Sequence, residues 1–245
     1  MVRSDYGYDA PYALIMFACA GTGTALVALF FLLKGLPRGA VVVGGYALFF
    51  FGNAASFFYT TRRGKFVEWA RILDGLHLRG DETVLDLGCG RGAVLTAVAR
   101  RLTSGRVTGV DIWSRTDQSG NAREVTLRNA VVEGVADRVH VETGDMRALP
   151  FPDASFDLVV SSLAIHNISG DADRRIAIAE AFRVLRPGGR LAIADIRATR
   201  VYADALRRLG AIDVARRRLG WRFWWGNPVA ATTLLTARKP GGRAR

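Results

Sequence analysis

A short apolar run that ends in three closely spaced glycines sets the strongest limit on how this chain can fold. Residues 84–92 read Val-Leu-Asp-Leu-Gly-Cys-Gly-Arg-Gly and lead into residues 93–102, which are rich in alanine and leucine. An apolar run, a glycine cluster and a helical run in this order predict a strand, a tight turn and a helix. Gly88, Gly90 and Gly92 let the backbone take positive φ and approach a ligand closely. The sequence therefore predicts an α/β sheet whose first turn binds a nucleotide-like molecule, with the helix N-terminus facing an anionic group such as a carboxylate.

The acidic residue ahead of the glycines indicates which ligand this turn binds. Gly88, Gly90 and Ala93 also satisfy the dinucleotide pattern, so glycine spacing alone leaves a nicotinamide-binding oxidoreductase open. Asp86 is placed at the carboxyl end of the strand, where a carboxylate would repel a pyrophosphate but could bind an ammonium group directly or through water. The position of Asp86 favours a cationic ligand.

These residues resemble the first motif of class I S-adenosylmethionine-dependent methyltransferases, acid-x-Gly-x-Gly-x-Gly. The other motifs of that family follow in order, as a strand ending in an acid, a turn, a fourth strand, and a turn into a fifth strand, at residues 107–111, 144–146, 156–161 and 183–195. The resemblance covers residues 64–239. It implies a Rossmann-like α/β sheet of seven strands, mostly parallel with the last strand antiparallel. It also implies S-adenosylmethionine as cofactor, with S-adenosylhomocysteine as its product.

The end of the chain independently indicates the antiparallel strand. Residues 211–217 and 228–238 read as strands joined too closely for a crossover helix, so they must form an antiparallel hairpin. The tip of this hairpin, residues 220–226, holds three of the five tryptophans. Packing in the core and contact with a membrane interface both remain open for these aromatic residues.

The resemblance also implies a role for particular residues in holding the cofactor. Asp86 and the glycine turn would bind its methionine end, Asp111 its ribose, and Asp145 with Met146 its adenine. Ile112 and Trp113 would pack on one face of the ligand. The cofactor-binding residues expected are Asp86, Gly88, Cys89, Gly90, Gly92, Asp111, Ile112, Trp113, Asp145, Met146 and Ser161.

Two loops are expected to face the methyl acceptor. Residues 112–121 form a polar loop in which Asp117, Gln118 and Asn121 are candidate acceptor contacts, although Asp117 and Asn121 could instead cap the next helix. Residues 162–168 leave the fourth strand and contain His166 and Asn167.

His166 is the candidate catalytic residue, since a histidine can take a proton from an acceptor hydroxyl near neutral pH. The alternative is that it orders the loop by hydrogen bonding to backbone. Asn167 is a further candidate acceptor contact. The sequence has no metal-ligand spacing, so no metal site is expected.

Two uncharged runs near the N-terminus predict a transmembrane helical hairpin. Residues 12–33 and 40–59 contain 22 and 20 residues without a charge, and each is long enough to cross about 30 Å of hydrocarbon. Asp5 and Asp9 precede the first run, which argues against a cleaved signal peptide. Small residues spaced by multiples of four would allow close helix contact, within the hairpin or between protomers of a homo-oligomer. These residues are Gly21, Ala25, Ala40, Gly44, Gly52 and Ser56.

The charge distribution fits a domain held at a membrane surface. The net charge is +12, and residues 1–60 carry only three basic and two acidic residues, which leaves +11 for the rest of the chain. Such a domain is attracted to anionic head groups, although a bias toward arginine would give the same count. Nucleic-acid binding is not expected, because no basic module interleaved with aromatics is present. Basic residues after the second run, and a cytosolic cofactor, favour a cytoplasmic N-terminus and catalytic domain.

The chain is therefore expected to divide into an N-terminal segment, a membrane hairpin, a methyltransferase domain and a disordered tail, at residues 1–11, 12–59, 60–239 and 240–245. The expected function is methyl transfer from S-adenosylmethionine to a small lipophilic acceptor, such as a quinone, isoprenoid or fatty-acid derivative. Two alternatives remain open. One is a tethered enzyme acting on a soluble molecule, and the other is a non-catalytic membrane assembly factor. The expected partners are the lipid bilayer and the acceptor.

Overall fold

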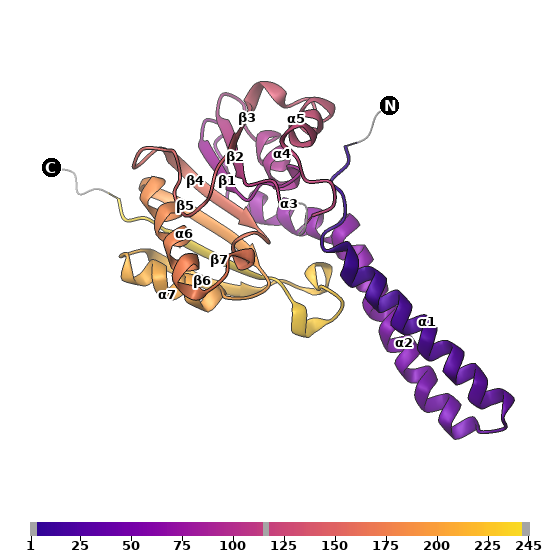
Figure 1. Ribbon diagram of the computed structural model, residues 1–245. Coiled ribbons are helices and arrows are strands. Elements are labelled where there is room, and N and C mark those ends of the chain that lie inside the picture. The colour runs from indigo at the N-terminus through magenta and orange to yellow at the C-terminus, as the bar shows by residue number, and fades with distance from the viewer. Residues whose placement is uncertain (1–3, 115–117, 242–245) are drawn as a thin grey trace.

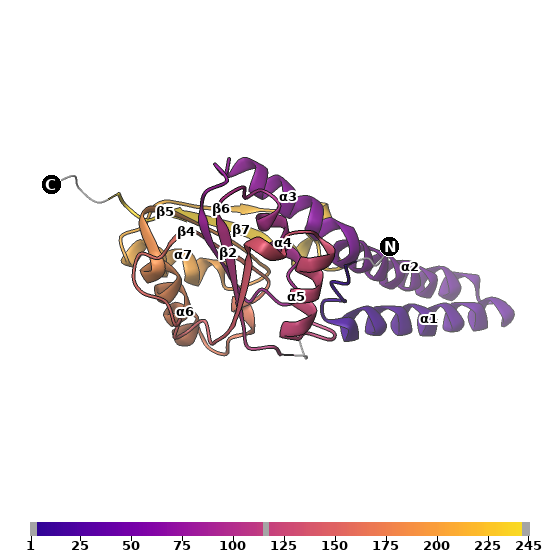
Figure 2. The same ribbon diagram turned by 90° about the horizontal axis from the view of Figure 1, so that it is seen from above.

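The computed structural model describes residues 4–114 and 118–241, and combines a twisted seven-stranded sheet with a long helical hairpin (Figures 1 and 2). The strand order is β3-β2-β1-β4-β5-β7-β6. The strands are β1 (Thr83–Leu87), β2 (Arg106–Asp111), β3 (Val139–Thr143), β4 (Phe156–Ser162), β5 (Leu185–Asp195), β6 (Ile212–Arg218) and β7 (Thr233–Arg238). The pairs among β1 to β5 are parallel, and β7 runs antiparallel to both β5 and β6. This confirms the predicted fold class.

Helices cover both faces of the sheet and enclose two apolar cores. One core packs beneath α3 (Lys65–Gly75), α4 (Ala93–Ala99) and α5 (Arg123–Val132), and the other beneath α6 (Asp171–Val184) and α7 (Thr199–Arg208). Successive residues of β1 point to opposite faces, so Val84 enters the first core and Leu85 the second. Because both faces are covered, the strand is apolar along most of its length and not alternating.

The hairpin consists of α1 (Pro11–Leu33) and α2 (Pro37–Tyr59), which lie side by side (Figure 1). Both helices begin slightly before the predicted apolar runs, because Pro11 and Pro37 fit the first turn of a helix. By length and composition each could cross a membrane. A Cβ built on Gly21 would lie 2.9 Å from the Phe51 ring, so this small residue serves contact within the hairpin.

The hairpin continues directly into the sheet domain. A π-helical turn, Thr60–Gly64, joins α2 to α3. The aromatic connection between β6 and β7, residues 219–232, packs against this junction. The Trp225 ring meets the Phe57 ring edge-on with centroids 5.0 Å apart, and Trp221 stacks on Tyr59 at 5.1 Å.

Packing at this junction is close enough to need a glycine. A Cβ on Gly64 would lie 1.8 Å from the carbonyl oxygen of Arg222. Trp225 is buried, whereas Trp221 is 52% exposed, so the aromatic residues of this connection divide between the core and the surface.

The last strand is shorter than predicted. It begins at Thr233, because Pro228–Ala230 forms a 3₁₀ turn in which the Asn227 side chain accepts a hydrogen bond from the Val229 backbone N–H. Similarly, the helix after the glycine turn covers only Ala93–Ala99 of the predicted residues 93–102. Residues 242–245 of the predicted tail lie outside the described residues.

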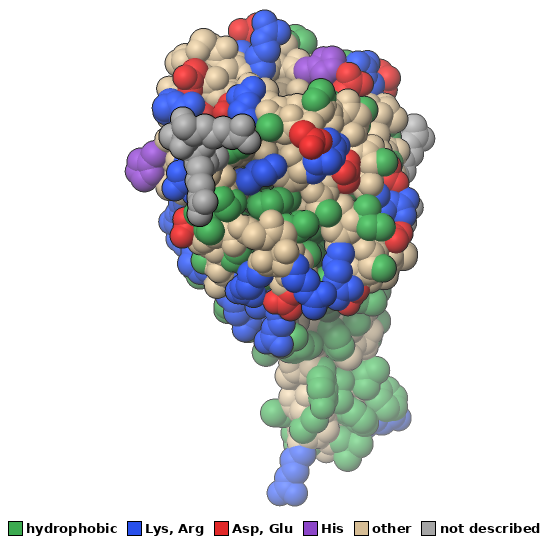
Figure 3. Space-filling view, turned by 90° about the vertical axis from the view of Figure 1, so that its left-hand side faces the viewer, with side chains coloured by type: hydrophobic (Ala, Val, Ile, Leu, Met, Phe, Trp, Pro, Cys, Tyr) green, Lys and Arg blue, Asp and Glu red, His purple; other side chains and the backbone are tan. Residues whose placement is uncertain are grey.

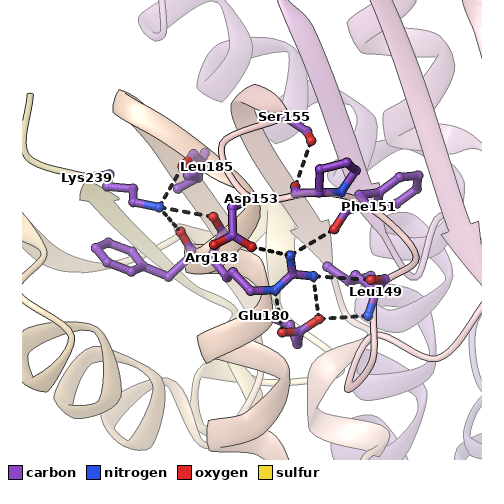
Figure 4. A network of polar contacts seen from close by, with 10 residues as sticks. Leu149, Phe151, Asp153, Ser155, Glu180, Arg183, Leu185 and Lys239 are labelled. Atoms are coloured by element: carbon purple, nitrogen blue, oxygen red, sulfur yellow. Dashed lines mark hydrogen bonds and ion pairs between the residues drawn. The ribbon is translucent and has the colours of Figure 1, made fainter. Parts of the chain in front are cut away.

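A polar network at the edge of the domain connects the C-terminal end of α6 with the chain that follows β7 (Figure 4). Arg183 pairs with Glu180 and with Asp153, each at 2.7 Å. The Lys239 ammonium donates to the carbonyls of Phe182, Arg183 and Leu185. A cation at the carboxyl end of a helix satisfies carbonyls that have no partner within the helix. The network therefore stabilises a part of the domain that lies away from the glycine turn.

Candidate functional site

The turn after β1 has the backbone conformation that its glycines predict. Gly88, Gly90 and Gly92 have φ of 69°, 51° and 85°. A Cβ on Gly88 would lie 2.2 Å from the Cβ of Ala164, and one on Gly90 would lie 2.5 Å from the Gln118 side-chain oxygen. The first two positions therefore need glycine for its conformation and for space.

Asp86 is a buried carboxylate beside this turn. The residue is 1% exposed, and neither oxygen has a hydrogen-bond partner of ordinary geometry among the described residues. Burial, followed by the charge of Asp111, raises the pKa of Asp86 to about 8, while the Leu95 backbone N–H acts in the opposite direction. An isolated buried charge is costly, so a cationic group placed here would stabilise the ionised carboxylate.

Asp111, at the end of β2, holds the glycine turn and the following loop together. Its Oδ2 accepts a hydrogen bond from the Gly90 N–H at 2.8 Å. Its Oδ1 accepts from the Trp113 N–H at 2.6 Å and from the Asn121 side-chain amide at 3.2 Å. Asn121 therefore positions Asp111 and forms part of the same wall.

The N-terminal strap, residues 4–10, crosses this region and was not anticipated from the sequence. The Asp5 carboxylate lies 2.6 Å from the guanidinium of Arg91, whose side chain is 8% exposed. Asp9 lies 2.6 Å from the Lys65 ammonium and accepts a hydrogen bond from the Thr61 hydroxyl at 2.8 Å. The strap thus contacts both the glycine turn and the base of the hairpin. The signal in the sequence was the acidic pair Asp5 and Asp9 ahead of an apolar helix.

Gln118 links the strap to the glycine turn. Its side-chain oxygen accepts from the Arg91 backbone N–H at 2.9 Å. Its amide donates to the Tyr6 carbonyl at 3.2 Å and to Asp9 Oδ1 at 3.3 Å. Gln118 therefore covers a free N–H at the start of the helix that follows the turn.

A cavity of about 820 Å³ connects these groups to the base of the hairpin. Asp86, Asp111 and the glycine turn line one end. Apolar and aromatic residues line the other end, and come from α1, α2, α3 and the connection between β6 and β7: Ala13, Phe57, Phe66, Trp69 and Trp225. Acidic groups and an apolar surface therefore line the same cavity.

Most of the site residues predicted from the sequence line this cavity. They are Asp86, Gly88, Cys89, Gly90, Asp111, Ile112, Gln118, Asn121, Asp145, Met146, His166 and Asn167. Gly92, Trp113 and Ser161 are not among the residues that line the cavity. The Ser161 hydroxyl donates a hydrogen bond to the Leu87 carbonyl, and the Trp113 indole donates one to the Thr143 hydroxyl. Asp117 lies outside the described residues.

The pKa values of two lining residues, Asp145 and Cys89, are shifted in opposite directions. The Asp145 carboxylate is held by the Arg147 guanidinium at 2.6 Å, and this hydrogen bond is the main reason that the pKa of Asp145 is lowered. Arg147 also pairs with Asp173 at 2.6 Å. Burial raises the pKa of the Cys89 thiol, so it remains neutral within the cavity wall.

His166 is oriented by a buried carboxylate that the sequence reasoning did not single out. Its Nδ1 lies 2.6 Å from Oδ1 of Asp195, the last residue of β5, which is 0% exposed; this is a close ion-pair contact, although the two atoms are not aligned as a hydrogen bond. The other Asp195 oxygen accepts from the His166 backbone N–H at 3.1 Å and from the Tyr202 hydroxyl at 3.2 Å. Nε2 is therefore the ring nitrogen available to the cavity. The signal in the sequence was an acid that ends a strand, as Asp111 does.

Comparison with known proteins identifies the central part of the chain. Residues 85–193 match the family model described as a methyltransferase domain. The 27-O-demethylrifamycin SV methyltransferase of Amycolatopsis mediterranei is 40% identical over 127 residues, 51% of this chain and 42% of that protein. The demethylmenaquinone methyltransferase of Lactiplantibacillus plantarum is 36% identical over 117 residues, 47% of this chain and 46% of that protein. The chain thus spans less than half the length of these relatives.

A solved structure shares the fold. The geranyl diphosphate C-methyltransferase of Streptomyces coelicolor, in complex with Mg²⁺, geranyl diphosphate and S-adenosyl-L-homocysteine, superposes with a TM-score of 0.56 at 18% identity. The match covers 71% of this chain and 78% of that one.

Proposed function

We propose that this chain, whose residues 85–193 belong to the S-adenosylmethionine-dependent methyltransferase family, is a membrane-anchored enzyme that methylates a lipophilic acceptor. One observation carries the proposal, namely that a single cavity joins the buried carboxylate of Asp86 to the apolar base of the hairpin. We assign residues 12–59 to the anchor and residues 60–239 to the catalytic domain. The basic pair Arg62 and Arg63 directly after α2 supports a cytoplasmic domain.

The residues at the glycine turn fit S-adenosylmethionine. Asp86 lacks a hydrogen-bond partner among the described residues and would meet the cofactor's ammonium group. The open backbone at Gly88 and Gly90 leaves space that a Cβ would fill. Asp111 and Met146 line the same cavity and would face the nucleoside. When bound, the cofactor supplies an electrophilic methyl group.

The protein's task is then to orient the acceptor and to exclude water. Correct alignment of two reactants can lower a barrier by roughly 7–11 kcal/mol. The strap and the Gln118 contacts cover the cavity at the glycine turn, and Trp69 donates from α3 to Ser162 at the end of β4 at 2.8 Å. These contacts hold parts of the cavity wall in place.

His166 would act as a base for an acceptor that carries a hydroxyl group. Nε2 would take the hydroxyl proton, and Asp195 would stabilise the resulting imidazolium through the 2.6 Å contact at Nδ1. A thiolate acceptor would need no base.

The hairpin end of the cavity supports a lipophilic acceptor. Ala13 and Phe57 belong to the two long apolar helices and also line the cavity. A molecule dissolved in the bilayer could therefore reach the methyl group without crossing water. One relative is named a demethylmenaquinone methyltransferase, which supports a quinone-like acceptor.

The proposal is tested with purified full-length protein in detergent. Calorimetry with S-adenosylhomocysteine should register binding. Incubation with methyl-labelled S-adenosylmethionine and a membrane lipid extract should then give labelled product in the organic phase. Label appearing only with water-soluble acceptors would favour the tethered enzyme with a soluble substrate. Binding of S-adenosylhomocysteine without methyl transfer to either kind of acceptor would favour the non-catalytic assembly factor. Absence of binding would overturn the cofactor assignment.

A further inference from the structure

A second hollow of about 460 Å³ lies on the side of α2, next to the connection between β6 and β7. We call it the α2 groove. Its walls come from the helix and from the aromatic connection, and include Leu48, Gly52, Tyr59, Trp221, Trp224 and Pro228. The Phe57–Trp225 ring pair lines the cofactor cavity but not the α2 groove, so the two hollows have separate walls at this point.

The α2 groove has the length of one membrane leaflet. Leu48 and Tyr59 mark its extent along the helix. At 1.5 Å per residue these eleven steps span about 16 Å, roughly half of the ~30 Å hydrocarbon core of a bilayer. Tyr59 is the last residue of α2 and precedes the basic Arg62 and Arg63, so it marks the head-group end.

The buried amide of Asn53 in the α2 groove is satisfied within the protein. Asn53 is 4% exposed, its amide donates to the Phe49 carbonyl at 2.7 Å, and its oxygen accepts from Asn227 at 2.9 Å. A Cβ on Gly52 would meet no described atom within 4 Å, so the groove is open there. A buried amide with its own partners and open apolar walls suit a hydrocarbon chain.

Three arginines lie beside the walls of the α2 groove. The Arg222 guanidinium lies over the Trp221 ring at 4.6 Å, and Arg218 donates to the Pro228 carbonyl at 2.7 Å. Exposed Arg63 adjoins Gly64, which abuts the Arg222 carbonyl. None of these three arginines forms an ion pair with an acidic side chain among the residues that the structure describes. Figure 3 shows the face of the domain that is turned away from the hairpin, and Lys and Arg side chains also gather along its lower edge.

We propose that the α2 groove binds an anionic phospholipid, with an acyl chain along α2 and the phosphate group at Arg63, Arg218 and Arg222. This inference rests on the proposed insertion of the hairpin into a bilayer. The bound lipid is structural, because the lining of the α2 groove shares no residue with the lining of the catalytic cavity. It holds the aromatic connection against α2 and so fixes the angle between the domain and the membrane.

The test uses full-length protein in phosphatidylcholine vesicles that contain a small, equal mole fraction of lipid brominated on its acyl chains. The brominated lipid is phosphatidylglycerol in one preparation and phosphatidylcholine in the other. Quenching of tryptophan fluorescence reports how much brominated lipid sits at Trp221 and Trp224. We expect stronger quenching by phosphatidylglycerol. The pair Arg63→Gln and Arg222→Gln should lower its relative occupancy about fivefold for each arginine removed.

Two further variants separate a built site from diffuse attraction. Gly52→Leu fills the α2 groove without a clash and should reduce quenching by both lipids, while leucine favours the helix. The pair Arg128→Gln and Arg175→Gln removes the same charge from exposed positions on α5 and α6 and should leave the preference unchanged.

Equal quenching by the two lipids, or the same loss in the control pair, would overturn the lipid site. Calorimetry with S-adenosylhomocysteine on the same preparations tests the catalytic proposal separately. Protein that fails to float with the vesicles would refute the membrane anchor and the lipid site together. Floating protein with no preference would refute only the lipid site.

Discussion

The sheet domain and the helical hairpin use the same apolar residue types in opposite ways. In the domain, Leu85 and Leu87 are 0% exposed, whereas in the hairpin Leu33 and Leu48 are 78% and 76% exposed. Leucine contributes to stability only when it leaves water, so the hairpin needs an apolar surrounding that the chain itself does not supply. The domain, in turn, encloses a carboxyl group without a hydrogen-bond partner among the described residues, Asp86, whose charged form a cationic ligand would stabilise. Each region is incomplete in a different way, and each deficit indicates a partner of a different kind.

The largest effect is expected for the proposed catalytic base, His166. His166→Asn should lower the turnover of a hydroxyl acceptor about 1,000-fold, since positioned proton transfer contributes typically 10²–10⁴. Asp195→Asn should cost less, about 100-fold, because the ring would remain but lose its orienting charge. Both variants should bind S-adenosylhomocysteine as the unmodified protein does. The measurements are kcat for methyl transfer and the dissociation constant of S-adenosylhomocysteine for each variant. Unchanged turnover in His166→Asn would assign the histidine a structural role.

Asp86 gives the next largest effect, because its charge has to be formed on binding. Asp86→Asn should weaken S-adenosylhomocysteine binding about 100-fold, as loss of one partner of a buried charge pair commonly does. The pKa of Asp86 is about 8, so near neutral pH the unmodified protein should release close to one proton on binding. Calorimetry in buffers of different ionisation enthalpy measures this proton, and the asparagine variant should release none from this site.

The same shift predicts how pH acts on the unliganded protein. The folded-state pKa of Asp86 lies above the ordinary value of 3.8, so folding favours the protonated acid. Its contribution to stability is complete below about pH 4 and is lost as the pH rises toward about 8. Chemical denaturation of Asp86→Asn should therefore show a smaller loss of stability over this range than the unmodified protein. An identical pH dependence in both proteins would contradict the assignment.

A pair of glycine substitutions compares the two regions directly. Gly88→Ala should destabilise the protein by about 2 kcal/mol or more, because the alanine would need positive φ and would meet the Cβ of Ala164. Gly45→Ala in α2 meets no described atom within 4 Å and should be neutral or stabilising by up to about 1 kcal/mol. Thermal unfolding in detergent measures both, and equal effects would remove the distinction between turn and hairpin.

The smallest expected effect tests the hairpin end of the cavity. Ala13→Phe fills space beside Phe57 and should raise KM for a lipophilic acceptor about tenfold, a change of about 1.4 kcal/mol. S-adenosylhomocysteine binding should stay the same, since Ala13 lies on α1 and not in the glycine turn. Steady-state kinetics with a bilayer-partitioning acceptor give the answer. A weakened cofactor with an unchanged KM would mean that the two ends of the cavity are not used as proposed.

The features predicted from sequence are those that leave a local signal. The glycine turn, the acid that precedes it and the apolar helices follow from residue spacing, because backbone conformation and helix length depend on neighbouring residues. The antiparallel pair at the end of the sheet followed from the short connection between its strands. These features established the fold class and most of the cavity wall around Asp86.

Contacts between distant segments were decided only by the tertiary structure. The strap meets Arg91 through Asp5, and His166 meets Asp195, across 86 and 29 residues of sequence respectively. Such pairs form where the fold brings two surfaces together, so no periodic pattern in the sequence predicts them. The aromatic connection left core and membrane both open in sequence, and packing on Phe57 and Tyr59 buries Trp225 while it leaves Trp221 52% exposed. Residue type and spacing thus determined what each segment could become, and long-range packing determined which groups face one another across the cavity.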